Sequence, residues 1–500
     1  MPKGKAVKKI IIAVLILLFL TVAGLFAADL FLFTVPEWAI YVPSVIMAVL
    51  TVLLIIKTRG KAPKVTAVIL TAVTAAMSFC GIYFDPYFNS LSLRVTGAEP
   101  TLPYDTVIPA DKACEDLAYV MHYYRKLHPV RLLERGHDAP VEKLAGEAAA
   151  DIVDAGSVTV NELAGYIEWA LSELGDAHTC AFTKYAEPLY LKHYYKWAKD
   201  GWDIAAVNGL TIKDLLEQSR ALFSFEAESW ELSQMKNMLV SVQGLDYLGF
   251  DVSGGVTYTF VDAEGEERTE TYPPDDFVTY AEYIAYNGSD STKSSRETSF
   301  VRFTIDEDRS LALLTLDECI YNSEYVNCLR DMFTQIRDKG IKNVAVDLRD
   351  NGGGNDRTAT EFIRYLDTDG YRYASETMRF GSFMTARSAD KAVNERYPDL
   401  TFRGSLYILT SASSFSSAML FPQYIKDNGL GTLIGEPPGN DPNGYGETAT
   451  FRTPNSGVWF TISTKRFYRT DSECTDKYVM PDVECSAKEA MDVLYDIIEK

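Results

Sequence analysis

The chain has 500 residues, of which 47% are hydrophobic, and its formal net charge is -21. This length is too great for a single hydrophobic core, so two or three domains are expected. Residues 1–64 carry +6 and the remainder carries -27, a balance that argues against nucleic acid or anionic lipid as a partner of the larger part. The seven cysteines include no Cys-x-x-Cys pair and the five histidines are scattered, so no metal or organic cofactor is implied.

Three apolar runs, residues 10–28, 39–56 and 65–83, fill most of the N-terminal segment 1–88. Each run is long enough to cross a bilayer as a helix. Lysines precede the first run, and lysines and an arginine lie between the second and third runs. The charged residues of the remaining loop, Asp29 and Glu37, are both acidic. The positive-inside rule then predicts a multi-pass protein of the cell membrane, with a cytoplasmic N-terminus and everything after the third run outside.

A cleaved signal peptide is the alternative for the first run, because residues 24–28 include the small residues Gly24, Ala27 and Ala28, which would suit a cleavage site. Either interpretation leaves the C-terminal bulk of the chain outside the cytoplasm. In an oxidising exterior Cys474 and Cys485 could pair, although a free or buried state is equally consistent with the sequence.

Residues 89–189 begin with a linker and continue as a helical region. Apolar spacing predicts helices over 112–127, 141–155 and 160–174, and the region ends in the polar segment 175–179, GDAHT. Residues 190–297 have a mixed pattern that predicts a strand, a turn and a helix over 203–222 and a hairpin over 256–272.

Residues 298–500 alternate between strand and helix patterns. Strands are predicted over 311–316, 343–348 and 406–409, and helices over 323–339 and 357–366. This alternation is typical of an α/β layer structure with a largely parallel sheet.

The stretch 405–435 combines a buried strand, a turn of small residues and a helix that begins near Ser416. Pro422 lies within the helical pattern and predicts a kink or an early end. A hydroxyl at a helix N-terminus sits where unpaired backbone N–H groups favour developing negative charge, as a serine nucleophile requires. The structural alternative is an ordinary serine cap without chemistry.

Two other segments offer groups for the same chemistry. Three glycines at 352–354 follow a buried strand, and their N–H groups could point at an oxyanion; the alternative is a turn required for packing, and the spacing of a phosphate loop is missing. His178 could accept the proton of Ser416, whereas a histidine after a helix is often a hydrogen-bonded structural residue.

Taken together, these segments resemble the C-terminal processing (tail-specific) serine peptidases, and more closely their tricorn-core and interphotoreceptor-retinoid-binding-protein-like branch. The matching motifs run in the family's order through residues 105–490: HP at 128–129, GDAHT at 175–179, DLRDNGGG at 347–354, FSSA at 415–418, LIGE at 433–436 and MPDV at 480–483. The resemblance implies a ClpP/crotonase-like α/β core over 298–500, preceded by a helical region. It also places a PDZ module near 190–297, where residues 202–216 resemble only the end of one.

The sequence departs from the Ser/Lys members of this family. They carry a lysine shortly after the I-G-E motif, where this chain has Asn440, so a Ser/Lys dyad is not expected. The tricorn-like branch uses the motif histidine as base, here His178, together with a late carboxylate. That carboxylate falls at Glu473 or Asp476, with Asp471 as a third candidate, and a solvated loop is the structural alternative for each.

The resemblance therefore implies a membrane-anchored, extracytoplasmic serine endopeptidase acting on peptides or proteins. Ser416 would be the nucleophile and His178 the base, and the N–H groups of Gly353 or Gly354 and of Ser417 would form the oxyanion hole. Two other classes stay open: a ligand-binding or sensing protein that keeps the fold without catalysis, and a membrane scaffold, which the lack of intramembrane charges disfavours. The sequence leaves the oligomeric state open.

Overall fold

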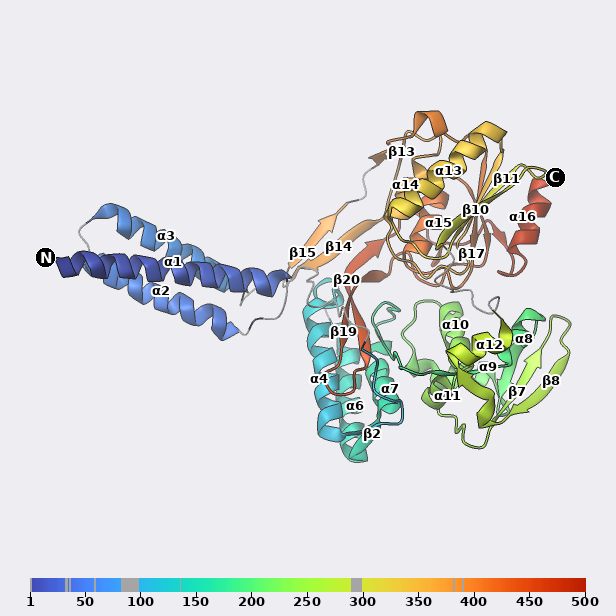
Figure 1. Ribbon diagram of the computed structural model, residues 1–500, viewed down its shortest axis with the longest axis horizontal. Coiled ribbons are helices and arrows are strands. Elements are labelled where there is room, and N and C mark those ends of the chain that lie inside the picture. Colours follow the sequence, from blue (N-terminus) through green and yellow to red (C-terminus); the bar gives the residue numbers. More distant parts are fainter. Residues whose placement is uncertain are drawn as a thin grey trace.

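The computed structural model describes residues 2–31, 35, 37–57, 60–81, 99–134, 136–288, 299–380, 383–388 and 391–500. Three helices stand apart from the rest at the N-terminal end (Figure 1): α1 (Pro2–Phe31), α2 (Glu37–Lys57) and α3 (Lys61–Phe79). They pack through Leu15, Met47 and Leu54, and most of their other large apolar side chains are exposed. Each is long and apolar enough to cross a membrane, as predicted; Tyr83 lies outside the described residues.

The helical region folds into a small bundle capped by a two-stranded ribbon. Thr159 begins the last helix with a capping box, in which its side chain accepts the N–H of Glu162 and the Glu162 carboxylate accepts the N–H of Thr159. The elements are β1 (Val107–Pro109), α4 (Ala110–Leu127), α5 (Val130–Leu133), α6 (Ala139–Ala155), β2 (Ser157–Thr159) and α7 (Val160–Ser172).

The mixed region has a core of its own around an antiparallel sheet of order β6-β5-β7-β8. The predicted start at residue 190 falls inside β4, and the predicted boundaries at 88–89 and 297–298 lie outside the described residues. Strand β3 (Cys180–Phe182) precedes this region and belongs to another sheet. The elements of the mixed region are β4 (Leu189–Leu191), α8 (Tyr194–Lys199), β5 (Asp203–Val207), β6 (Leu210–Thr211), α9 (Ile212–Ser219), η2 (Arg220–Leu222), α10 (Glu228–Met238), α11 (Val242–Tyr247), β7 (Val256–Val261), β8 (Glu267–Tyr272), η3 (Pro274–Asp276), β9 (Phe277–Thr279) and α12 (Tyr280–Asn287).

The α/β core is built on a six-stranded sheet of order β10-β11-β12-β17-β18-β21, antiparallel only between β10 and β11. Its elements are β10 (Val301–Asp306), β11 (Leu311–Leu316), α13 (Ser323–Lys339), β12 (Asn343–Asp347), α14 (Arg357–Ile363), β17 (Ser405–Thr410), α15 (Ser417–Asp427), β18 (Thr432–Gly435), β21 (Val483–Glu484) and α16 (Ala490–Ile498). The predicted α/β core with a largely parallel sheet is confirmed.

Both faces of this sheet are covered, which explains the nearly continuous apolar runs in its central strands β11, β12 and β17. Leu406 and Ile408 of β17 pack under α13, α14 and α15, while Tyr407 and Leu409 face α16, because successive side chains of a strand point to opposite faces. Figure 1 shows α16 on the side of the sheet opposite to α13 and α14. Helix α15 continues through Pro422, so the predicted early end there is wrong.

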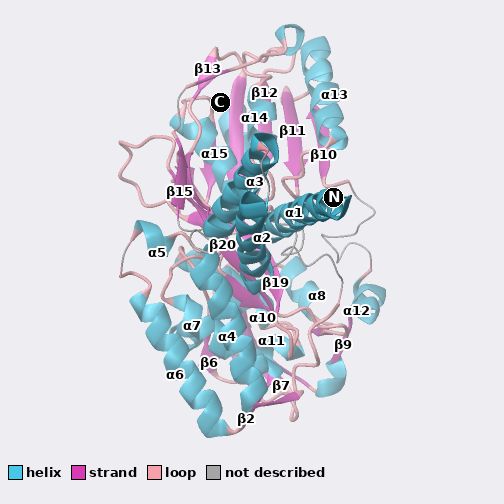
Figure 2. Ribbon diagram, turned by 90° about the vertical axis from the view of Figure 1, so that its left-hand side faces the viewer, coloured by secondary structure: helices cyan, strands magenta, loops and turns pink. Residues whose placement is uncertain are grey.

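A second, antiparallel sheet of order β15-β14-β20-β19 joins the α/β core to the helical region. Figure 2 shows β19 and β20 between the upper strands β10–β12 and the lower helices α4, α6 and α7. Phe451 and Phe460 of this sheet belong to the same buried cluster as the helices, and β3 pairs with β20. The remaining elements are β13 (Gly370–Tyr371), β14 (Ser375–Phe380), β15 (Phe383–Arg387), β16 (Ala392–Val393), η5 (Pro398–Leu400), β19 (Tyr445–Arg452) and β20 (Trp459–Tyr468).

Candidate active site

Ser416 lies at a strained point of the turn between β17 and α15. Its backbone angles, φ 57° and ψ -122°, fall in a region that residues with a Cβ rarely adopt. The turn is held by neighbouring backbone: the Ser416 N–H donates to Asn440 Oδ1 at 2.8 Å, and the Phe415 N–H donates to the Asn351 carbonyl at 3.0 Å. A serine on a sharp strand-to-helix turn with positive φ is the geometry that projects a nucleophilic Oγ away from the sheet.

The glycine loop after β12 packs directly against this turn. A Cβ on Gly353, whose φ is +107°, would lie 2.7 Å from both the Phe415 carbonyl oxygen and Ser416 Cβ, so only glycine fits. The Gly353 N–H already donates to Asn351 Oδ1 at 2.8 Å. Of the predicted oxyanion donors, the N–H groups of Gly354 and Ser417 have no hydrogen-bond acceptor among the described residues, and both residues line the cavity.

His178 lies beside the serine turn although it is far away in sequence. Pairing of β3 with β20 fixes its loop, and the His178 carbonyl accepts the Thr461 hydroxyl at 2.7 Å. The imidazole packs on the ring of Phe415 with 4.5 Å between centroids. His178 and Ser416 line one cavity of about 750 Å³, so the structure brings these two predicted residues into one site.

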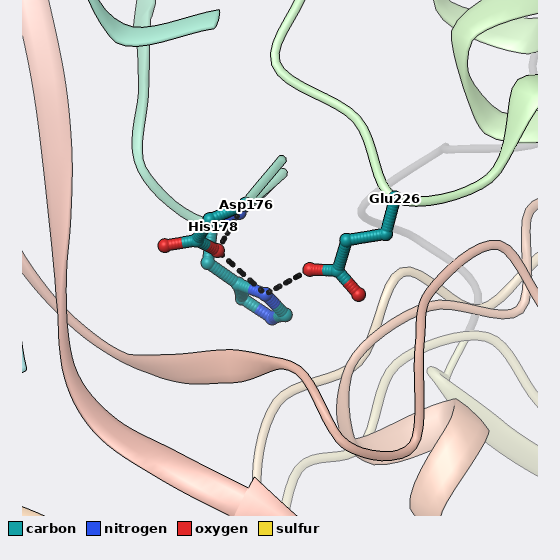
Figure 3. A group of neighbouring side chains, drawn as sticks. All are labelled: Asp176, His178 and Glu226. Atoms are coloured by element: carbon teal, nitrogen blue, oxygen red, sulfur yellow. Dashed lines mark hydrogen bonds and ion pairs between the residues drawn. The ribbon is translucent and has the colours of Figure 1, made fainter. Parts of the chain in front are cut away.

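Two buried carboxylates face the imidazole (Figure 3). His178 Nδ1 is 3.8 Å from Asp176 Oδ1 and 3.9 Å from Glu226 Oε1. Within the described part of the chain, neither ring nitrogen has a hydrogen-bond partner. Asp176 accepts the His178 backbone N–H at 2.9 Å and lies 3.0 Å from His128 Nε2. Burial opposes its ionisation, but the bond with His128 and the nearness of His178 lower the pKa of Asp176.

Glu226, which the sequence interpretation missed, comes from the mixed region between η2 and α10. Its Oε2 accepts the Asp441 N–H at 2.5 Å, and its carbonyl accepts the Tyr478 hydroxyl at 3.0 Å. Burial raises the pKa of Glu226, while the adjacent His178 opposes that rise. The only signal in the sequence is an acidic residue among aromatic ones, Phe223, Phe225 and Trp230, which indicates burial but no function.

The structure does not bring the predicted late carboxylates to the cavity. Glu473 and Asp476 are exposed described residues outside its lining. Their loop is tied to the far end of α15, because the Asp471 N–H donates to Asp427 at 3.1 Å and Arg469 pairs with Asp427 at 3.0 Å. An eleven-residue helix is about 16 Å long, so this anchor lies well away from Ser416.

The rest of the cavity wall is strongly charged. Lys465 lies 3.4 Å from the carboxylates of both Glu376 and Glu447, and Arg387 lies 3.5 Å from Glu376. Burial raises the pKa of Asp356, which lines the same cavity. The wall therefore suits a polar chain better than an apolar ligand. Cys474 and Cys485, the cysteines considered for pairing, are free thiols.

Comparisons with known proteins bear on this site. A sequence model of peptidase family S41 matches residues 311–485, which include the serine turn and the glycine loop. The fold resembles that of mature CPAF (TM-score 0.53, 12% identity, covering 78% of this chain and 96% of that one) and of mature CPAF complexed with lactacystin (TM-score 0.53, 12% identity, 78% and 97%).

A weaker likeness links the chain to the photosystem II D1 C-terminal processing protease (TM-score 0.44, 13% identity, 78% and 97%). No curated protein matches the chain. At 12% identity the two CPAF structures show a similar fold and nothing more, whereas the family match rests on the amino-acid sequence of the core. The identified likeness is therefore that of residues 311–485 to peptidase family S41, a family of serine peptidases.

Proposed function

We propose that the chain is a membrane-anchored serine endopeptidase of the C-terminal processing type, which cleaves peptides or proteins outside the cytoplasm. The observation that carries this proposal is the position of Ser416: a strained serine at the head of α15, in one cavity with His178. The match of residues 311–485 to the model of peptidase family S41 supports the same chemistry.

In the proposed mechanism, Ser416 Oγ attacks the carbonyl carbon of the scissile peptide bond while His178 takes the hydroxyl proton. The tetrahedral intermediate collapses when His178 returns the proton to the leaving amine, which leaves an acyl ester on Ser416. Water, deprotonated by His178, then attacks the ester carbonyl, and His178 returns that proton to Ser416 Oγ as the acid leaves. Asp176 and Glu226 stabilise the imidazolium that forms twice in this cycle, and Glu226 takes the place that the sequence interpretation gave to Glu473 or Asp476.

The N–H groups of Gly354 and Ser417 are the proposed donors to the oxyanion. Ser417 opens α15, so its N–H belongs to the unpaired first turn of the helix. Because the Gly353 N–H donates to Asn351 Oδ1, it is not a free donor. Gly353 contributes to the site by lacking a side chain, which lets the serine turn pack closely against it. Loss of one such donor typically lowers kcat by about 100- to 1,000-fold.

Asn440 supports a Ser/His mechanism over a Ser/Lys one. Its amide oxygen accepts the Ser416 N–H, and its side chain is buried. The residue thus fixes the backbone of the nucleophile and offers no base.

For the anchor, the three apolar helices and the lysines and arginines beside them support a cytoplasmic N-terminus and an outer peptidase core. Cysteines placed one at a time at residue 60 and in the C-terminal helix α16, in a chain whose seven native cysteines are replaced by serine, would test this orientation when intact cells are labelled with a membrane-impermeant reagent. We expect only the α16 label.

The test of the activity compares the full-length chain in detergent with Ser416→Ala, using an unstructured protein substrate and a fluorophosphonate label. The matched control is Ser413→Ala in the same turn; among the described residues, its hydroxyl has one hydrogen-bond partner, the Ser233 hydroxyl at 3.4 Å. We expect cleavage and labelling to disappear in Ser416→Ala and to persist in the control. Lactacystin, found in complex with mature CPAF, is a second probe of Ser416. Cleavage that survives Ser416→Ala would refute the mechanism.

A ligand-binding or sensing protein on the same fold is the second candidate. The observation that favours it is that both ring nitrogens of His178 lie without a hydrogen-bond partner in the described part of the chain. Under this alternative neither cleavage nor labelling occurs, and a peptide binds equally well to the chain and to Ser416→Ala.

A further inference from the structure

The group formed by Asp176, His178 and Glu226 has the dimensions of a metal site. One ligand atom from each of the three residues lies within 4.8 Å of the other two. His178 Nδ1 is 3.8 Å from Asp176 Oδ1 and 3.9 Å from Glu226 Oε1, and Figure 3 shows both carboxylates directed at the same edge of the imidazole. Ligands of a tetrahedral zinc ion with bonds near 2.0–2.1 Å are about 3.3 Å apart. Side-chain rotations that move the ligand atoms by a few tenths of an ångström to about one ångström would therefore bring all three into bonding distance of one ion.

Two of these three atoms, His178 Nδ1 and Glu226 Oε1, have no hydrogen-bond partner among the described residues, while Asp176 Oδ1 accepts the His178 backbone N–H. Both ring nitrogens of His178 and Glu226 Oε1 are buried without a hydrogen bond among the described residues, in side chains that are 10% and 4% exposed. Buried polar atoms without partners are costly and require an explanation. A cation at this point would satisfy Nδ1 and Oε1 together.

Each carboxylate is also oriented by a contact on its other oxygen. Asp176 Oδ2 lies 3.0 Å from buried His128 Nε2, and Glu226 Oε2 accepts the Asp441 N–H. These bonds leave Asp176 Oδ1 and Glu226 Oε1 facing Nδ1. Metal ligands in proteins are typically held in this way by a further set of hydrogen bonds.

We propose that Asp176, His178 and Glu226 bind a divalent transition-metal ion of the Zn²⁺ type, and that the bound ion turns the peptidase off. One imidazole and two carboxylates suit Zn²⁺ or Co²⁺ and do not suit Mg²⁺ or Ca²⁺, which prefer all-oxygen sites with more ligands. The ion reaches the site through the cavity, because His178 lines it.

The inhibitory part rests on the proposed function. An ion on the Nδ1 lone pair requires the ring proton to be on Nε2, so that Nε2 can no longer accept the Ser416 proton. The ion also replaces the carboxylate charge that stabilises the imidazolium. Binding shifts the ring proton from one nitrogen to the other and blocks the first step of the cycle.

Binding is measured on the full-length Ser416→Ala chain in detergent, so that its outcome is independent of catalysis. ZnCl₂ is titrated by calorimetry, and CoCl₂ by its visible absorption, which reports nitrogen and oxygen ligation directly. We expect one ion per chain. Glu226→Gln and His178→Gln should each weaken binding at least tenfold, whereas Glu228→Gln, an exposed residue two positions from Glu226 that pairs with Arg220, should not change it.

Equal affinity in Glu226→Gln, His178→Gln and the control would overturn the site, as would a failure to bind either ion. With the wild-type chain, we expect cleavage to fall as the site fills and to return with EDTA; unchanged cleavage at full occupancy would overturn the inhibitory role. A chain without any peptidase activity would refute the proposed function and that role together, while the titration would still decide whether the metal site exists.

Discussion

The two sides of the cavity are built in different ways. The nucleophile side comes from neighbouring parallel strands of the core, where backbone turns at 351–354 and 411–417 interlock through short bonds such as Phe415 N–H to Asn351 O. The base side is assembled from three distant parts: His178 follows the helical bundle, Glu226 belongs to the mixed region, and β20 pairs with the strand after His178.

The nucleophile side fixes the position of the reacting serine, and the base side sets the charge and orientation of the imidazole that acts on it. The serine turn depends on local backbone geometry, which a short motif can encode. The imidazole depends on contacts between residues that lie far apart in the sequence, so no short motif can encode its environment. Changes on the nucleophile side should therefore abolish activity, and changes on the base side should adjust it.

The largest effect is expected from Gly353→Ala on the nucleophile side. The new Cβ would meet the Phe415 carbonyl oxygen and Ser416 Cβ at 2.7 Å, in a backbone with φ +107°. Because both the nucleophile and the oxyanion donors would move, we expect kcat to fall by about 1,000-fold. The matched control is Gly352→Ala, whose Cβ would have no heavy atom within 4 Å; equal activity of both variants would contradict the interlocked turns.

On the base side, Glu226→Gln keeps the shape of the side chain and removes its charge. We expect kcat to fall by about 100-fold in metal-free buffer with little change in KM, since the imidazolium loses a stabilising charge only after it forms. Steady-state kinetics in the presence of EDTA would measure kcat and KM. Glu228→Gln is the control variant. An unchanged kcat would leave Asp176 as the sole carboxylate acting on His178.

The same division decides what the sequence could reveal. Helix α13 begins and ends where its apolar spacing and its closing glycine predict, and Ser416 stands at the turn that the strand and helix patterns mark. Glu226 carries no such pattern: its hydrogen-bond partners Asp441 and Tyr478 are 215 and 252 positions away. The late carboxylates Glu473 and Asp476 rested on family register alone, and no local pattern could show that their loop is anchored at Asp427.

A smaller effect should follow from Glu168→Gln, which links both loops of the base side. Glu168 Oε2 accepts the Ala181 N–H at 2.6 Å and Oε1 accepts the Ser224 N–H at 2.5 Å, so one carboxylate positions the loops of His178 and Glu226. A glutamine has one oxygen and one NH₂ group, so its NH₂ group would face one of these two N–H donors and that hydrogen bond would be lost. We expect about a tenfold lower kcat and a loss of about 1–3 kcal/mol in the free energy of unfolding.

The control for this prediction lies in the same helical region. Glu173→Gln changes an exposed residue just after α7 and should alter neither quantity. A Glu168→Gln variant that loses stability but keeps kcat would show that Glu168 supports the fold without positioning the catalytic loops.

The smallest effect concerns the pH dependence of stability, through Glu231 in α10. Its two carboxylate oxygens are buried without a hydrogen bond in the described chain, and burial raises its pKa from 4.5 to about 7. The folded state thus holds the proton that the unfolded state releases above pH 4.5, so the contribution of Glu231 to stability falls as pH rises from about 4.5 to 7 and stays low above that. We expect Glu231→Gln, measured by thermal unfolding, to reduce the fall in Tm between pH 5 and pH 8 by roughly 2–6 °C, whereas Glu228→Gln leaves it unchanged. Trp230 of α10 packs on Phe415 with 4.1 Å between ring centroids, so a pH-dependent loosening of this helix would reach the serine turn. Identical pH profiles of Tm in the wild-type chain, Glu231→Gln and Glu228→Gln would show that Glu231 is not the group that titrates.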